Sequence, residues 1–148
     1  MPTIAEIKTA ALIAAVTSVL EIATANLVAA TAASDAAHRA IEVAVRAGGY
    51  DSFEIGTSSV TVPARLRSWS AAGGIAPPGR VDIGLGGLVS TWKAASAATV
   101  RRQNELAGLK YVLDEAKGLL AAYPPAEEDI LPGLQTMLTA IQASMVAP

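Results

Sequence analysis

The chain has 148 residues, of which 52% are hydrophobic, 4% aromatic and 16% charged, and its formal net charge is -2. It has no cysteine, which excludes disulfides, thiol catalysis and thiolate metal sites. A nearly neutral chain lacks the positive charge from which a dedicated nucleic-acid-binding protein draws its affinity. The hydrophobic residues are mostly Ala, Leu, Ile and Val, which favours helix. We therefore expect a mainly α protein: a helical bundle with one small β-hairpin and a Gly/Pro-rich arm, forming a single domain over residues 1–148.

The low charge content also predicts apolar surface that one copy of the chain does not cover. Soluble domains usually carry about 25% charged residues, against 16% here. Association with further copies of the same chain is the simplest way to remove such surface from water.

Residues 1–47 are predicted to form an N-terminal helical segment. Thr3 and Glu6 have the spacing of a capping box, which would start a helix there. In helical projection the polar residues that follow form one narrow stripe, and apolar side chains occupy most of the circumference. We expect residues 4–33 to be buried mainly against other subunits or a partner. Because charged residues interrupt this segment, neither a membrane span nor a signal peptide is expected.

Residues 1–47 could form either one continuous helix or two helices. Ser34 and Asp35 are residue types that cap helices, so they could begin a second helix or lie within one long helix. A continuous helix would be about 65 Å long, more than a small domain needs. We therefore expect a break or bend near Ser34. Gly48 and Gly49 should end the segment, because glycine readily adopts the left-handed conformation that follows a helix.

Residues 50–63 change to the alternating pattern of β-strands. Apolar side chains alternate with polar ones at Phe53, Ile55, Val60 and Val62. The glycine at Gly56 lies between the two runs, so this segment is predicted to be a β-hairpin. Pro63 should stop the second strand and begin a helix over residues 64–72.

Residues 76–87 are the predicted arm. Pro77 and Pro78 favour a turn or extended chain, and the glycines Gly84, Gly86 and Gly87 argue against a helix. Within the arm the apolar residues alternate, at Val81, Ile83 and Leu85. Such a segment can add a strand to the sheet edge of a neighbouring subunit or partner. A surface loop folded over its own subunit is the other interpretation, and it stays open.

Residues 90–146 are predicted to form a helical hairpin. Ser90 would cap the first helix, which runs to about Ala122. Pro124 and Pro125 then separate it from a second helix, over residues 130–146. The carboxylates that precede this helix suit the positive end of its dipole, at Glu127, Glu128 and Asp129.

No group of residues predicts catalysis or cofactor binding. His38 is the only histidine, and although Ser34 and Asp35 lie on neighbouring turns, any helix would give that spacing. The glycines near Gly84 are not followed by the Lys-Ser/Thr of a phosphate-binding loop. Consecutive carboxylates point in different directions, so they do not converge on a metal ion. We expect no enzyme activity, no metal and no cofactor.

Two residue types remain as candidates for contacts with partners. Tryptophan is enriched at interfaces, so Trp69 and Trp92 are candidate interface anchors, as are Val81, Ile83 and Leu85 of the arm. Core packing accounts equally well for the tryptophans. A weak basic patch could face DNA in the lumen of an assembly, through Arg65, Arg67, Arg101 and Arg102. The carboxylates of the same helix, including Glu105, are expected to be ordinary surface charges.

Residues 47–72 resemble the centre of the small head–tail joining proteins of tailed bacteriophages, of the lambda W type. That family has a helix, a β-hairpin of the form S-F-x-I-G-x-x-S-V-T and a second helix. The matching residues are Ser52, Phe53, Ile55, Gly56, Ser59, Val60, Thr61 and Leu66. The resemblance implies a structural role and no catalytic residues. The chain departs from the family by its long apolar helix before the motif and by its arm and helical hairpin after it.

The leading functional hypothesis is therefore a virion structural protein at the head–tail junction. It would form a homo-oligomeric ring that binds portal and tail proteins, in the virion or, during assembly, in the host cytoplasm. An alternative is a bacterial helical-bundle interaction protein, secretion-associated or chaperone-like, acting as a monomer or dimer with a distinct client. A small enzyme of an unrecognised type is a third, but the sequence shows no polar pocket for it.

Overall fold

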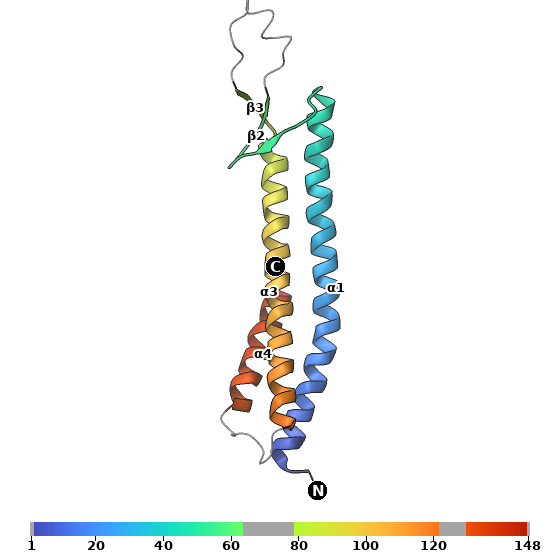
Figure 1. Ribbon diagram of the computed structural model, residues 1–148, viewed down its shortest axis with the longest axis vertical. Helices are drawn as coiled ribbons and strands as arrows, with labels where there is room; N and C mark the ends of the chain where they lie inside the picture. The colour runs from blue at the N-terminus through green and yellow to red at the C-terminus, as the bar shows by residue number, and fades with distance from the viewer. Residues whose placement is uncertain (1, 64–78, 122–129, 148) are drawn as a thin grey trace, which may run out of the picture. The chain divides into compact units, whose positions relative to one another are not determined.

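A computed structural model describes residues 2–63, 79–121 and 130–147 of the chain. Figure 1 shows three helices in these ranges, α1 (Ile4–Ala47), α3 (Gly86–Ala121) and α4 (Ile130–Val146), and three short strands, β1 (Glu54–Ile55), β2 (Val60–Pro63) and β3 (Arg80–Gly84). The strands form one antiparallel sheet in the order β1-β2-β3. The prediction of a mainly α protein with a small hairpin is confirmed. The helix predicted over residues 64–72 lies outside the described residues.

The chain divides into two compact units. Unit 1 comprises Met1–Ala30 and Ala98–Pro148, and unit 2 comprises Thr31–Ala97. A single domain for residues 1–148 stays a prediction.

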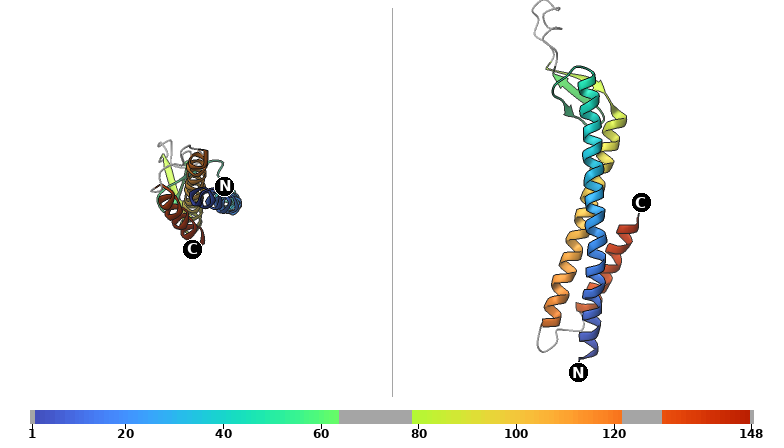
Figure 2. Two further views of the ribbon diagram at one scale, coloured as in Figure 1. Left: turned by 90° about the horizontal axis from the view of Figure 1, so that it is seen from below. Right: turned by 90° about the vertical axis from the view of Figure 1, so that its right-hand side faces the viewer.

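Unit 1 is a bundle of three helical segments around one hydrophobic core. Figures 1 and 2 show α4 beside α1 and α3 in this unit. Each helix contributes three buried side chains, from Leu12, Val16, Ala23, Leu109, Val112, Ala116, Leu131, Leu134 and Leu138. The spacing of these residues by three, four or seven positions puts them on one face of each helix. The helical hairpin predicted over residues 90–146 supplies two of the three helices.

Unit 2 packs the small sheet against helix. Its core holds Ile41, Val45, Val60, Val62 and Val89, from the end of α1, from β2 and from the start of α3. The two valines of β2 are two positions apart, so both side chains face the helices while Thr61 between them points away. The hairpin of β1 and β2 pairs Ile55 with Val60, as the alternating pattern predicted.

The ends of α1 are set by local hydrogen bonds. The Thr3 hydroxyl accepts a hydrogen bond from the backbone N–H of Glu6 at 3.1 Å, and the Glu6 carboxylate accepts one from the N–H of Thr3 at 2.7 Å. The predicted capping box is therefore present. At the other end, Gly49 has a φ of 85°, and the N–H of Tyr50 donates to the carbonyl of Val45 at 3.2 Å. This is the hydrogen bond of a Schellman motif, and it needs glycine at the left-handed position.

The break predicted near Ser34 is wrong. α1 continues through this residue to Ala47. The Ser34 hydroxyl does not cap a helix but lies 3.3 Å from the hydroxyl of Ser96 on α3, in a partly buried position. Because its partner is 62 positions away in the sequence, the residue type alone favoured a cap where the fold uses a contact between helices.

Residues 76–78 of the predicted arm, with Pro77 and Pro78, lie outside the described residues, and the rest of the segment differs from the prediction. Arg80–Gly84 is strand β3, which pairs antiparallel with β2 of the same sheet. The alternating residues therefore extend the chain's own sheet, and the prediction that this segment docks on a neighbouring subunit is not needed to explain them. The register pairs Val62 with Val81 and Pro63 with Arg80.

The prediction that the next helix begins at Ser90 is also wrong. α3 begins at Gly86, four positions before the predicted cap at Ser90, although the glycines there argued against a helix. Gly84 and Leu85 have positive φ values, 78° and 62°, which turn the chain sharply from β3 into α3. Leucine rarely adopts this conformation. Its side chain packs against the unit 2 core, and that burial offsets the backbone strain.

Candidate interaction surfaces

The first candidate surface is the side of α1 that points away from the unit cores. Its large exposed side chains are Ile4, Ile7, Ile22, Val28 and Val43, with 56% to 72% of their surface accessible. At 100° per residue the first four, which belong to unit 1, fall within about a third of the helix circumference, and Val43 belongs to unit 2. Many of the exposed positions between them are alanines. The sequence predicted an apolar arc too wide for one copy to cover, and within the described residues this arc is covered on one side only.

Three threonines of α1 satisfy their hydroxyl donors within the helix. The hydroxyls of Thr9, Thr17 and Thr24 each donate to the carbonyl four residues earlier, at 2.7 to 2.8 Å. Threonine thus turns its donor back onto the backbone. The two exposed threonines, Thr17 and Thr24, therefore have their donors occupied within the helix.

α1 also meets the length and composition criteria for a membrane-spanning helix. One 18-residue stretch has a mean hydropathy of 1.8, and 17% of it is buried. Core helices of soluble proteins and signal sequences meet the same criteria. In unit 1 the buried side of α1 packs on α3, which exposes Lys110, Asp114 and Lys117. A spanning α1 would carry these charges into hydrocarbon, which is costly. The packing favours a protein partner for the exposed side.

The second candidate surface is the sheet of unit 2, which holds the arm residues. Val81 is 37% exposed, whereas Ile83 and Leu85 pack against the unit 2 core. Trp92 is half-buried against the same core. Three of the four described interface candidates therefore contribute to the fold of their own chain, and Val81 is the most accessible of them. Trp69 lies outside the described residues.

Polar contacts hold β3 in place on this surface. Arg80 donates to the hydroxyl and to the carbonyl of Thr61, both at 3.1 Å, and its Nε lies 3.5 Å from a carboxylate oxygen of Glu54. Lys93 of α3 donates to the carbonyl of Thr57 in the hairpin turn. Asp82 accepts hydrogen bonds from the N–H of Gly84 at 2.7 Å and from the hydroxyl of Ser59 at 2.8 Å.

These two hydrogen bonds lower the pKa of the Asp82 carboxyl, which a titration can test. Bonding to the Gly84 N–H, and then to the Ser59 hydroxyl, lowers the pKa of Asp82 below its ordinary value of 3.8. A lowered pKa in the folded state means that the carboxylate contributes stability at neutral pH, and that this contribution is lost as the pH falls through the folded pKa. We expect Asp82 to titrate below 3.8 when its side-chain carbon is followed by NMR. Ser59→Ala should raise its pKa, whereas Ser58→Ala in the same turn should not. Titration at or above 3.8 in the native chain would contradict this assignment.

The third candidate, the basic patch, has another role in the structure. Arg102 lies 2.8 Å from a carboxylate oxygen of Glu105 and donates to the carbonyl of Met145 at 3.2 Å. Arg101 lies 3.9 Å from the other oxygen of Glu105 and donates to the carbonyl of Ala147 at 3.0 Å. Both arginines therefore hold the end of α4 against α3 in unit 1. This arrangement does not favour a DNA-facing role for them, and Arg65 and Arg67 lie outside the described residues.

Glu105 is the residue that the sequence interpretation missed. It was expected on the surface, but only 4% of it is exposed, and its second oxygen accepts a hydrogen bond from Ser144 of α4. A signal was present: Glu105 lies four and seven positions before Leu109 and Val112, so it continues the buried face of α3. The two arginines one turn earlier supply its counter-charges.

The residues considered for catalysis, Ser34, Asp35 and His38, all lie in unit 2. The ring of His38 lies 5.7 Å from that of Phe53 and 6.1 Å from that of Trp92, and its Nδ1 is 3.4 Å from Glu42. Ser34 bonds to Ser96 instead of to the histidine. Among the described residues no cluster of three or more histidine, aspartate or glutamate side chains could hold a metal ion.

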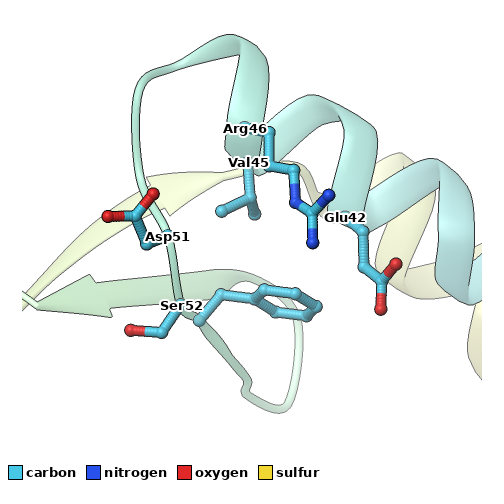
Figure 3. A pocket seen from close by; sticks show the side chains of 6 residues that line it. Glu42, Val45, Arg46, Asp51 and Ser52 are labelled. Carbon is cyan, nitrogen blue, oxygen red and sulfur yellow. The ribbon is translucent and has the colours of Figure 1, made fainter.

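Two small hollows share Glu42 in their lining. One, of about 240 Å³, is lined by Glu42, Val45, Arg46, Asp51, Ser52 and Phe53. Figure 3 shows that Glu42 and Arg46 extend into it from the last turns of α1, and that Asp51 and Ser52 come from the chain that follows. The other, of about 220 Å³, is lined by Asp35, His38, Arg39 and Glu42. Their charges are mixed and most of these side chains are open to solvent, so neither hollow indicates a particular ligand.

No known family, curated protein or solved structure matches this chain.

Proposed function

We propose that this chain is a structural assembly protein that acts together with copies of itself, as a connector at the head–tail junction of a tailed bacteriophage. The observation that carries the proposal is the exposed apolar side of α1, where Ile4, Ile22 and Val28 are each more than half accessible. These three side chains belong to unit 1, and an exposed apolar strip along a helix is a typical feature of a subunit interface. Burial of one such side chain contributes about 1.5 to 3 kcal/mol.

The phage assignment is supported by the resemblance of residues 47–72 to lambda W-type joining proteins. Within the described part of that segment, a helix end is followed by a β-hairpin whose turn holds Gly56 and Ser59, joined by a backbone hydrogen bond of 2.8 Å. A connector of this kind would form a ring and bind portal and tail proteins. Mixed, open hollows and side chains engaged in packing are in keeping with a structural role.

The self-assembly part of the proposal predicts the effect of a charge on α1. Val28→Asp should abolish or weaken association at least about tenfold, because it places a carboxylate in an apolar contact. Val28 is 64% exposed in a single copy, so the fold should be retained. Val100→Asp is the matched control, since Val100 is 53% exposed on α3. Sedimentation velocity over a wide range of concentrations measures association, and circular dichroism checks helicity. A native chain that remains monomeric at every concentration would overturn the proposal.

The phage assignment has an independent test in the genes that flank the coding sequence. Portal and tail genes on either side would agree with a connector. Flanking genes for a secretion system or its clients would instead favour the helical-bundle interaction protein. These outcomes do not depend on whether the chain associates in solution.

A further inference from the structure

A second exposed apolar surface of unit 1 lies where α3 and α4 meet. Ile141 of α4 lies against Gly108 of α3, since its side chain is 2.8 Å from the point that a Cβ on Gly108 would occupy. The two helices are antiparallel. Three positions on along α3 and four positions back along α4 therefore lead to Tyr111 and Met137 at about the same level. Tyr111 is 53% exposed, Met137 is 38% exposed, and Ile130, about two turns before Met137, is 39% exposed. These three side chains form the junction patch.

The junction patch and the apolar strip of α1 lie on different sides of unit 1. In helical projection, the contact of α3 with α4 at Gly108 lies between Tyr111 and the core residue Leu109. Tyr111 therefore borders the outer side of the α3–α4 pair, whereas α1 packs on the core side of that pair. The apolar strip of α1 faces away from the same core, and its large side chains in unit 1 are Ile4, Ile7, Ile22 and Val28.

Two glycines leave open space beside the junction patch. Gly118 follows Tyr111 by seven positions and Gly133 precedes Met137 by four, so they lie on the same sides of α3 and α4 as the patch. Among the described residues, no atom lies within 4 Å of the point that a Cβ would occupy on either glycine. Glycine is less favourable than alanine within a helix. Packing inside the described part of unit 1 does not require it at these two positions, in contrast to Gly108. Such a surface suits the close approach of another helix.

We propose that the apolar strip of α1 docks on the junction patch of a second copy. This inference rests on the proposed self-assembly and names the two surfaces that meet. The strip fits the patch in shape, because small residues separate Ile7 from Ile22 along it and leave room for the projecting side chain of Tyr111. These small residues are Ala11, Ala14, Ala15 and Ser18.

The charges of unit 1 stay at the edges of this contact. α4 has no charged residue between Ile130 and Val146, and Glu115 of α3 lies beside the patch. On α1, Lys8 and Glu21 lie on the two opposite edges of the strip, and the carboxylate of Glu6 is bonded to the N–H of Thr3. An apolar centre with charges at its rim is the usual composition of a protein interface.

The two surfaces together favour a ring over a closed pair. A contact between different surfaces is heterologous, so each copy uses its strip toward one neighbour and its patch toward the other. α4 has 17 residues, so the contact is about 25 Å long and buries about 700 Å² in total. This area is smaller than a stable pair of proteins needs. A closed ring gives each copy two such contacts, so we expect the ring to be stable and the isolated pair to be weak.

Mixing two defective chains tests whether strip meets patch. Ile22→Asp damages the strip and Met137→Asp damages the patch, and each alone should weaken association at least about tenfold. Ile22 is 57% exposed and Met137 is 38% exposed, so circular dichroism should show native helicity in both. The 1:1 mixture still holds one intact strip and one intact patch, so sedimentation velocity at high concentration should detect pairs and no larger species. Val146→Asp is the control, because Val146 is 84% exposed and lies nine positions from Met137, on the opposite side of α4.

The outcomes separate this inference from the proposed function. If Met137→Asp associates like the native chain, or if the mixture forms no pairs, the strip does not meet the patch, and the proposed self-assembly stands without this contact. A native chain that remains monomeric at every concentration overturns both.

The glycine beside the patch gives a second readout, in which stability and association change in opposite directions. Gly118→Ala should raise the urea midpoint of the isolated chain, because alanine favours helix. The same substitution should weaken association about fivefold, since the added methyl group occupies space that the strip of the second copy needs. Association as strong as that of the native chain would mean that no helix approaches Gly118, and the proposed contact would be wrong.

Discussion

Leu109→Ala is expected to lower the free energy of unfolding of unit 1 by about 3 kcal/mol. Leu109 is fully buried, and it belongs to the core where α1, α3 and α4 meet. Truncation removes the transfer free energy of the leucine side chain and leaves a cavity between three helices that cannot all close on it. Urea unfolding followed by circular dichroism measures the effect.

The same helix supplies a matched control. Leu120 is also a leucine of α3, but it is 43% exposed, so Leu120→Ala should cost less than about 1 kcal/mol. Equal effects of the two substitutions would show that the core of unit 1 is not centred on Leu109.

Glu105→Ala is expected to destabilise unit 1 by about 3 kcal/mol, because it removes the counter-charge of two arginines at the junction of α3 and α4. Glu105 has 4% of its side chain exposed, and Arg102 has 17%. With the carboxylate gone, Arg102 remains in a largely buried position without an anion, and Ser144 loses its acceptor. The side chain of Arg101 is 36% exposed, although its Nε is buried, and this partial exposure keeps the cost at the lower end of the range for a broken buried pair.

Glu115→Ala on the exposed side of α3 is the control and should change stability by less than about 0.5 kcal/mol. Hydrogen exchange shows which part of unit 1 the Glu105→Ala substitution destabilises. Hydrogen exchange should increase in α4 of the Glu105→Ala chain, since both arginines bond to carbonyls at its C-terminal end. An unchanged α4 would mean that these bonds do not hold the helix in solution.

Much of the architecture could be predicted from local sequence. The capping box of Thr3 and Glu6, the glycine end of α1, the β1–β2 hairpin and the bounds of α4 all depend on residues a few positions apart. In each case hydrogen bonds or turn chemistry within the segment determine its structure. The apolar arc of α1 could be predicted for the same reason, since it follows from helical spacing alone.

Three features depended on distant partners and were predicted wrongly or missed. α1 continues through Ser34 because it packs beside α3, β3 exists because β2 offers it a sheet edge, and Glu105 is buried because α4 covers it. Residue type alone favoured a helix cap at Ser34, an arm at the segment of β3 and a surface charge at Glu105. The partners lie 62, about 20 and 39 positions away in the sequence, beyond the reach of any local pattern.

The sequence by itself thus determined that this chain is mainly helical, that it turns through a hairpin near Gly56, and that α1 carries a wide apolar arc. These properties follow from side-chain chemistry and from the periods of helix and strand. Only the tertiary structure decided which part of that apolar arc stays exposed, because burial depends on where α3 and α4 pack. It also assigned the alternating residues of β3 and the arginines of α3 to the fold of their own chain, since their hydrogen-bond partners come from strands and helices distant in sequence.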